Sequence, residues 1–385
     1  MKICILTQPL HTNYGGLLQA FALQKVLRDM GHEVVTDSDG AKRQMAFHMR
    51  VVHFAYHLLK RYIIRDKRYN PYQFLFTCFN KYPKKKKALG VNTDRFINQQ
   101  IATVDFFQGK TKPSTEMLRR FDALVVGSDQ VWRAIYSYTP AYFLDFTKGI
   151  DIKRVAYAAS FGKDDVDEYR PSALQKCKDA APLFDAISVR EDSGVTLCKE
   201  YFGAEAIHVL DPTMLLEQED YLATIEEEDK AERSNILMCY VLDKSEEKTA
   251  IIKQFTTRLN LTPLEVMPKK NFDASVTGDL TDYIFPSVSK WIAGFRDAEF
   301  VVTDSFHGTV FSIIFNKPFV AIANAARGAS RFTSLLKIFK LEHRLVSSLE
   351  DITDAHFTTI DFKQVNKTKK LWQTKAVEFL TNGLK

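Results

Sequence analysis

Short apolar runs alternate with helical patterns along most of the chain. The first apolar run, KICILT at residues 2–7, is followed by a loop and by a helical pattern from Leu17 to Met30; Val34 and Val35 then form a second apolar run. A strand, a helix and another strand in this order predict a βαβ unit. We therefore expect a parallel sheet that starts at the beginning of the chain.

Four further runs of the same kind lie before residue 215. Each is short and apolar and leads into Gly, Ser or Asp, which is typical of buried parallel strands whose carboxyl ends carry a site. They are residues 123–129 (ALVVGSD), 154–160 (RVAYAAS), 186–192 (AISVRED) and 207–213 (IHVLDPT). This series predicts a first domain over residues 1–215, with an insertion at about residues 42–100.

A charged stretch at residues 217–234 separates this series from a second one. The second series contains predicted strands at residues 235–242, 263–267, 298–304 and 318–322, and predicted helices at 246–259 and 288–295, the latter with Ser287 as N-cap. The chain is therefore predicted to be an α/β protein with two Rossmann-like doubly wound domains, 1–215 and 216–385, which face each other across a cleft. Ligands are expected at the carboxyl ends of the strands of both domains.

The insertion concentrates the positive charge of the protein. Residues 42–90 contain 13 Lys and Arg but only one acidic residue, a local charge of +12 in a chain whose net charge is +6. Within it, apolar residues recur at helical spacing between Phe47 and Tyr62, with Lys60, Arg61 and Arg65 among the polar positions. The pattern indicates a basic amphipathic helix. It fits a helix packed on the protein's own core, or a surface that contacts anionic lipid headgroups or an acidic glycan.

Other features exclude several classes of protein. The five cysteines are odd in number and form no CxxC pair, which argues against a disulfide framework or a structural zinc site and favours a reducing cytoplasm. The start of the chain has the pattern of a first core strand and not of a signal peptide. No apolar run is long enough to cross a bilayer. No nucleic-acid-binding signature accompanies the basic charge, so we expect no nucleic-acid partner.

Two polar loops follow predicted strands of the first domain. Residues 11–16 (HTNYGG) contain two glycines that would let backbone amides approach a ligand, although a tight turn alone would also require glycine. Residues 127–133 (GSDQVWR) place Ser128 and Asp129 at the next strand end, where Asp129 could orient a hydroxyl or simply cap a helix. Both loops are candidates for lining the cleft.

Arg190 and His307 are the two candidates for chemistry. Arg190 follows the strand at residues 186–189, where a guanidinium can bind a carboxylate or phosphate with two hydrogen bonds, or pair internally with Glu191 or Asp192. His307 lies in TDSFHGTVF (residues 303–311), at a corner between a predicted strand and a predicted helix. An imidazole there could exchange a proton with a bound anion, or be an ordinary buried histidine.

Ordered blocks of the sequence resemble the polysaccharide pyruvyl transferase family. They are NYGGLLQAFALQKVL with GHEV, FDALVVGSDQVW, AYAASFG, ISVREDSG, VLDPT and VVTDSFHGTVFSIIFNKPFV, and they span most of residues 1–322. The resemblance implies a GT-B type fold. It also implies transfer of a pyruvate unit from phosphoenolpyruvate, as co-substrate and without a further cofactor or metal, to two hydroxyls of a sugar.

The resemblance suggests roles for the residues in these loops. His307 is then the general acid or base, and Arg190 binds the carboxylate or phosphate of the donor. The amides of Gly308 and Thr309, together with Ser305, contact the donor phosphate. The residues on the first-domain side, where the acceptor sugar is expected, are Asn13, Tyr14, Gly15, Gly16, Ser128 and Asp129.

One position departs from the family pattern. Where family members have an Arg-Leu-His triplet, this chain has Ser305, Phe306 and His307, so an expected donor-binding cation is missing. Arg327 or Arg331, in the loop after the strand at residues 318–322, could replace it or be ordinary loop residues.

Two other functions fit the same sequence, a GT-B glycosyltransferase that uses a nucleotide sugar and a non-catalytic glycan-binding protein. The family's role in cell-surface polysaccharides implies a glycan or lipid-linked oligosaccharide acceptor. It also implies a cytoplasmic location, with contact at the inner face of the membrane through the basic helix.

Overall fold

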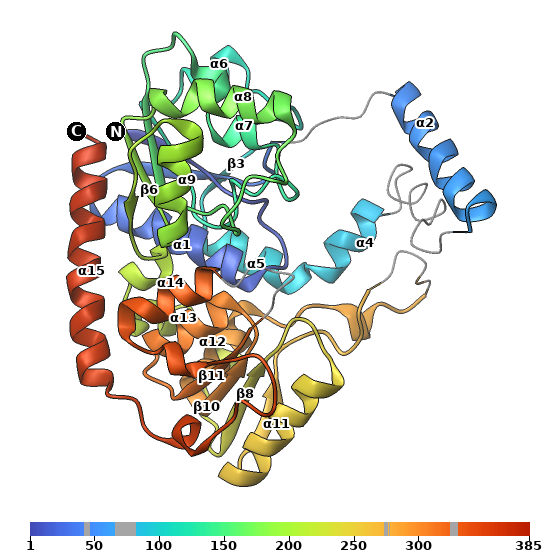
Figure 1. Cartoon of the computed structure of the whole chain (residues 1–385), viewed down its shortest axis with the longest axis vertical. Coiled ribbons are helices and arrows are strands. Elements are labelled where there is room, and N and C mark those ends of the chain that lie inside the picture. Colours follow the sequence, from blue (N-terminus) through green and yellow to red (C-terminus); the bar gives the residue numbers. More distant parts are fainter. Residues whose placement is uncertain (42–46, 66–81, 273–275, 277, 324–329) are drawn as a thin grey trace.

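The computed structural model describes residues 1–41, 47–65, 82–272, 276, 278–323 and 330–385. They form two α/β units stacked one above the other in Figure 1. A long C-terminal helix runs along one side of both. Each unit is built on its own parallel sheet, so the predicted fold of two Rossmann-like domains, the GT-B arrangement, is confirmed.

The first sheet has the strand order β3-β2-β1-β4-β5-β6-β7, and every neighbouring pair is parallel. Its strands are β1 Lys2–Leu6, β2 Glu33–Asp37, β3 Thr103–Val104, β4 Ala123–Val126, β5 Lys153–Ala159, β6 Ala186–Val189 and β7 Ile207–His208. The order reverses between β1 and β4, and the predicted loops after these two strands therefore lie side by side at the switch point.

The second sheet has the order β12-β11-β10-β8-β9 and is also parallel throughout. Its strands are β8 Ile236–Tyr240, β9 Thr262–Glu265, β10 Ala298–Thr303, β11 Phe319–Ile322 and β12 Leu345–Val346. The central strand β10 is apolar and buried except for Glu299, because it has neighbours on both sides and helices on its faces.

Most helices of the described residues cover the faces of these sheets or connect their strands, whereas α2 stands away from both sheets. They are α1 Tyr14–Asp29, α2 Phe47–Leu58, α4 Tyr82–Leu89, α5 Val91–Gln100, α6 Thr115–Leu118, α7 Thr139–Tyr142, α8 Pro171–Ala180, α9 Asp192–Phe202, α10 Gln218–Leu222, α11 Glu246–Leu259, α12 Val288–Asp297, α13 Phe306–Ile314, α14 Ser330–Phe339 and α15 Phe362–Gly383. α11 has the predicted bounds, and Ser287 caps α12 as predicted by accepting from the amide of Lys290 at 3.0 Å.

The first helix begins three residues earlier than expected. Tyr14, Gly15 and Gly16 form the first turn of α1 and not a loop before it. Tyr14 is fully buried, its hydroxyl donates to the carbonyl of Pro286 in the second domain at 2.8 Å, and its ring stacks on Trp291 at 5.8 Å between centroids. This contact between the domains fixes the start of α1, a tertiary effect that local sequence does not reveal.

The C-terminal helix returns to the first domain. α15 contacts β5, and its Gly383 packs against Ala186 and Val155 of the first sheet. The ring of Phe379 also lies near that of Tyr157. The predicted boundary at residue 215 separates the two sheets in sequence. Residues 362–383, however, follow the second sheet in sequence and pack on the first domain.

The basic insertion forms the predicted helix. This helix was expected either to pack on the protein's own core or to form an exposed contact surface. α2 continues into a π-helical turn at Leu59–Ile63 and stands away from both domains in Figure 1. Among the described residues between 51 and 65, no side chain is buried. The structure therefore does not support packing of this helix on the protein's own core.

Candidate functional site

A cavity of about 320 Å³ lies between the two domains at the carboxyl ends of β1, β4, β8 and β10. Its lining comes from both domains and consists of Thr12, Asn13, Asp129, Gln130, Tyr136, Tyr240, Leu242, Met267, Phe285, Asp304, Ser305, Phe306, His307, Arg331 and Phe332. Such a position is where doubly wound folds bind ligands. Five of the predicted site residues are in this set, and they are Asn13, Asp129, Ser305, His307 and Arg331.

His307 is positioned by the start of α13. Ser305 caps this helix by accepting from the amide of Gly308 at 3.4 Å, so His307 lies in its first turn with 6% of its surface exposed. Its Nε2 is 3.5 Å from Oδ2 of Asp211, a residue of the first domain. The other ring nitrogen, Nδ1, lies against Gly15.

Gly15 allows this placement of the imidazole. A Cβ added to Gly15 would lie 2.1 Å from Nδ1 of His307 and 2.2 Å from its Cγ, so any side chain there would overlap the ring. Gly15 therefore contacts a histidine of the second domain but is not among the residues that line the cavity. Gly16 faces Asn13 instead, at 3.0 Å from its Nδ2 to the added Cβ.

Arg190 lies beneath the cavity as the centre of a buried charge cluster. Its Nη1 donates to Asp211 at 2.7 Å and its Nη2 donates to Asp129 at 3.2 Å, while its guanidinium stacks 4.5 Å from the ring centroid of Phe306. The side chain is 1% exposed and does not line the cavity. The structure therefore places Arg190 outside the lining of the cavity and in contact with two carboxylates, and its contact with the donor stays a prediction.

The ion pairs of Arg190 also differ from the expected ones. Glu191 does not hold the guanidinium in a salt bridge but accepts from the hydroxyl of Ser160 at 3.1 Å and from the amide of Phe161 at 2.7 Å. Burial raises the pKa of Glu191, against the effect of Arg190. Asp192 pairs with Lys337 at 3.5 Å on the surface.

The cluster keeps two buried carboxyls ionised. Burial alone would raise the pKa of Asp211, but His307, Arg190 and the bond from Thr213 together hold that pKa well below its usual value. Burial likewise opposes ionisation of Asp129, yet Arg190 and His307 lower its pKa below the usual range. The ionised carboxylate of Asp211 therefore lies next to the imidazole of His307.

The predicted phosphate contact through two amides needs correction. The amide of Thr309 donates to the carbonyl of Ser305 at 3.0 Å, and the amide of Gly308 donates to the Ser305 hydroxyl oxygen. Each amide carries one hydrogen, so both are already used within the start of α13. Thr309 is fully buried. Gly308 packs on Thr303, whose Oγ1 would be 2.1 Å from an added Cβ.

Arg331 supplies a cation at the cavity. It lies in the first turn of α14, is 5% exposed, and holds its guanidinium 5.6 Å from the ring centroid of Phe306. Burial and the neighbouring charge of Arg190 lower its pKa to about 10, so it remains charged at neutral pH. It is the candidate that the sequence offered to replace the missing arginine. Arg327, the other candidate, lies outside the described residues.

Tyr14 and Ser128 were predicted to line the cleft, but both are buried and neither is in the lining of the cavity, although the Ser128 hydroxyl lies 3.5 Å from Asp211. Tyr14 belongs to the contact between the domains. Ser128 is fully buried and donates to the carbonyl of Ala158 at 2.8 Å, while its amide donates to the side chain of Gln19 at 2.9 Å.

Sequence reasoning missed Asp211, which joins both Arg190 and His307. It lies in the block VLDPT, where its Oδ1 also accepts from the hydroxyl of Thr213 at 2.7 Å. An acidic residue at the end of a predicted strand was the available signal. Asp304 was missed as well, and it holds residues 242 and 243 through their amides and pairs with Lys248 at 2.7 Å.

Within the described ranges, no group of three or more His, Cys, Asp or Glu side chains could hold a metal ion. No helix of the described chain combines the length and apolar character needed to cross a membrane.

Comparison with known proteins links these features to one family. The family model described as polysaccharide pyruvyl transferase matches residues 13–325, which include the loops at both sheet edges. No curated protein matches the chain in sequence.

Solved structures with similar folds are distant in sequence. A UDP-GlcNAc 2-epimerase from Neisseria meningitidis bound to UDP-GlcNAc is 10% identical, with 98% of this chain and 94% of that chain covered and a TM-score of 0.49. The S. aureus MnaA-UDP co-structure is 12% identical, with 96% and 90% covered and a TM-score of 0.48.

Proposed function

The chain belongs to the polysaccharide pyruvyl transferase family, and from this premise we propose that it transfers pyruvate from phosphoenolpyruvate to two hydroxyls of a sugar. The product is a ketal on a cell-surface polysaccharide or lipid-linked oligosaccharide. One observation carries the proposal, namely that His307 and Arg331 line the same cavity while Asp211 faces Nε2 of the histidine. A proton donor and a cation beside one cavity are what an acid-catalysed reaction of a dianion requires.

The reaction starts with proton transfer to the methylene carbon of phosphoenolpyruvate. The imidazole of His307 gives this proton, which turns the methylene into a methyl group and leaves a cationic carbon that still carries the phosphate. A sugar hydroxyl attacks that carbon, and its proton returns to His307. The C–O bond to phosphate then breaks as a second hydroxyl attacks, and the second proton leaves with phosphate or water.

The surrounding residues support these steps. Asp211 and Asp129 remain ionised at neutral pH, because the neighbouring His307 and Arg190 hold their pKa values low. Arg190 fixes the two carboxylates in place. Arg331 would bind the carboxylate or phosphate of the donor, the task of the arginine that Ser305 replaces. No metal or further cofactor takes part in this scheme.

The test is turnover by single variants of the cavity. His307→Gln should lower phosphate release in the presence of an accepted glycan by about 100-fold or more, the usual range for removing a general acid. Arg331→Gln should raise the KM for phosphoenolpyruvate. His32→Gln is the matched control, because His32 lies before β2 at the opposite edge of the first sheet. Turnover of His307→Gln at the wild-type rate would refute the assignment.

The same protein separates the two alternatives. A GT-B glycosyltransferase would be stabilised against thermal unfolding by a nucleotide sugar and not by phosphoenolpyruvate, whereas the proposed enzyme shows the reverse. A non-catalytic glycan-binding protein would bind the acceptor without releasing phosphate.

We further propose that α2 contacts an anionic membrane surface at the cytoplasmic face, where a lipid-linked acceptor would lie. Val52 of α2 is 59% exposed and Ile63, in the π-helical turn that follows α2, is 74% exposed. Lys60, Arg61 and Arg65 are close by in sequence. Exposed apolar residues beside basic ones are typical of helices that lie in the interface of anionic bilayers.

Vesicle binding tests this contact. Wild-type protein should sediment with phosphatidylserine-containing vesicles and not with pure phosphatidylcholine vesicles, and changing Lys60, Arg61 and Arg65 to Gln should abolish sedimentation. Three exposed lysines of α15, at positions 363, 367 and 370, provide a control with the same loss of charge. Equal sedimentation of the two triple variants would refute the proposal.

A further inference from the structure

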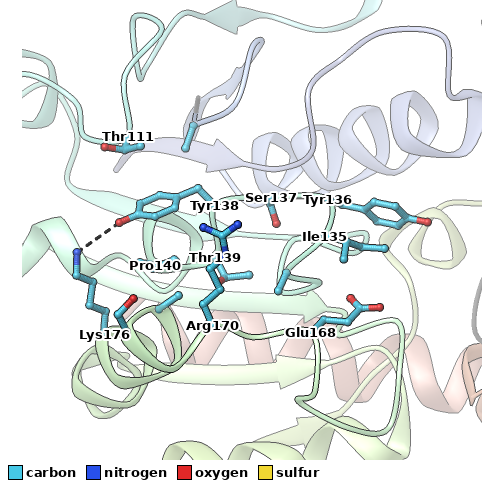
Figure 2. Close-up of a pocket in the computed structure, with 14 residues that line it drawn as sticks. Thr111, Ile135, Tyr136, Ser137, Tyr138, Thr139, Pro140, Glu168, Arg170 and Lys176 are labelled. Carbon is cyan, nitrogen blue, oxygen red and sulfur yellow. Dashed lines mark hydrogen bonds between the residues drawn. The ribbon is translucent and has the colours of Figure 1, made fainter. Parts of the chain in front are cut away.

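A second cavity, of about 510 Å³, lies in the first domain beside the cleft (Figure 2). Three short stretches of chain supply most of its lining, namely residues 134–140, 168–176 and Thr111. Tyr136 lines this cavity and also the cavity that contains His307. The two cavities are therefore neighbours that share one aromatic wall.

The shared wall is held by buried charges. Arg133 is 4% exposed, and its guanidinium lies 4.7 Å from the ring centroid of Tyr136 while Nη1 donates to the tyrosine hydroxyl at 3.4 Å. Nη2 of the same arginine pairs with Glu168 at 3.1 Å, and Nη1 donates to Gln130 at 3.1 Å. Glu168 lines the second cavity and Gln130 the first, so Arg133 ties the walls of both to Tyr136.

The second cavity carries positive charge, because the exposed side chains of Arg170 and Lys176 line it. Asp145 lies near Lys176, whose charge partly offsets the rise in the pKa of Asp145 that burial causes. In Figure 2 the guanidinium of Arg170 points into the middle of the pocket, and no hydrogen bond or ion pair joins it to any part of the chain that the structure describes. Nζ of Lys176 donates to the hydroxyl of Tyr138 at 3.5 Å. Glu168 contributes no net charge, since Arg133 offsets it.

Apolar and aromatic surface lies next to these cations. Ile135 is 59% exposed and Tyr136 is 47% exposed. Tyr138 also lines the pocket. A sugar ring offers both hydroxyls and an apolar face, and aromatic side chains with polar tips suit both. Guanidinium and ammonium groups select a carboxylate or phosphate on that sugar.

We propose that this second cavity is an acceptor subsite, which binds an anionic sugar residue of the glycan next to the sugar that reacts in the first cavity. The inference rests on the proposed function in so far as it names the acceptor as an acidic glycan. Tyr136, which lines both cavities, lies between the two sugars, and Arg170 and Lys176 bind the anionic group.

Direct binding of defined oligosaccharides tests the subsite without any turnover. Tetragalacturonate serves as the anionic probe and cellotetraose as a neutral one of the same length, each titrated calorimetrically. Wild-type protein should bind tetragalacturonate at least tenfold more tightly than cellotetraose, with an affinity that falls as salt rises. The double variant Arg170→Gln/Lys176→Gln should lose this preference. Tyr136→Ala should weaken both probes.

The control variant is Lys253→Gln, which removes one exposed positive charge from α11 in the other domain. It should bind tetragalacturonate like the wild type. Wild-type affinity in the Arg170/Lys176 variant would overturn the proposal, as would failure of the wild-type protein to prefer the anionic probe.

Phosphoenolpyruvate separates failure of the subsite from failure of the proposed function. The Arg170/Lys176 variant should keep the wild-type rise in melting temperature with phosphoenolpyruvate, because both residues lie outside the cavity of His307. If phosphoenolpyruvate stabilises neither protein while tetragalacturonate binding still depends on Arg170, the donor assignment fails and the subsite stands. If phosphoenolpyruvate stabilises both and the probes do not discriminate, the subsite alone fails.

Discussion

Replacing Gly15 by alanine is expected to damage the site through a single methyl group. The added Cβ would lie 2.1 Å from Nδ1 of His307, whereas ordinary contacts begin at 3.4 Å. The imidazole or the start of α1 must therefore move by about 1.3 Å, and a displacement of about 1 Å at a reacting group can cost about 100-fold in rate. That factor corresponds to about 2.7 kcal/mol of the activation free energy.

The sign of the stability change also tests the geometry. In a helix without neighbours, alanine is favoured over glycine by about 1 kcal/mol. At Gly15 the three nearest atoms to the added Cβ all belong to His307, and even the farthest of them, the Cβ, is 2.7 Å away. We therefore expect Gly15→Ala to lower the free energy of unfolding, against its helix propensity.

The assay is phosphate release with an accepted glycan, combined with urea unfolding, for a double-mutant cycle. Gly15→Ala should lower turnover about 100-fold in the wild-type background and very little further in His307→Gln, because both changes act on the same imidazole. Wild-type turnover of Gly15→Ala, or losses that simply add in the double variant, would refute the close approach of these two residues.

Three further outcomes follow from the buried contacts. Since folding lowers the pKa of Asp211 and Asp129 below the value of about 3.9 in an unfolded chain, their ionisation stabilises the protein fully at neutral pH, and this stabilisation is lost as the pH falls through about 4 and below. Asp211→Asn should thus lose stability at pH 7 but show a shallower decline on acidification, measured by urea unfolding at a series of pH values; parallel decline would contradict this. Arg190→Ala leaves two buried carboxylates without their cation and should lower the free energy of unfolding by about 3–5 kcal/mol. Arg190→Met keeps much of the side-chain volume but removes the charge, so it should also be less stable than the wild type. Unfolding midpoints like wild type in both variants would argue against the ion pairs. Tyr14→Phe removes only the hydrogen bond to Pro286, so it should lower the free energy of unfolding by about 1 kcal/mol and leave activity unchanged. If Tyr14→Phe lost as much stability as Tyr14→Ala, the stacking of the ring on Trp291 would contribute nothing.

The sequence predicted the elements better than the contacts between them. α11 and the cap of α12 followed from helical spacing and a serine, which are local signals. The start of α1 did not, because Tyr14 is held by a residue of the second domain. The packing of α15 on the first sheet was not predictable from local sequence either, because its apolar face could have packed on either domain.

The candidate site shows the same division. Position at a strand end correctly brought His307 and Asp129 to one cavity, because carboxyl ends of parallel strands meet at one edge. The partners of Arg190 were not predictable in this way, since Asp129 and Asp211 belong to different loops that only the folded sheet brings together. The exposure of the apolar side chains of α2 could not be predicted either, because helical periodicity alone does not show what packs against a helix face.

The path of α15 has a consequence for synthesis of the protein on the ribosome. The face of the first sheet near Val155 and Ala186 is covered by residues close to Gly383, so this apolar surface stays open while the entire second domain is being translated. The first half of the chain cannot reach its final packing as an independent nascent domain. A molecular chaperone could shield this surface until α15 has left the ribosome.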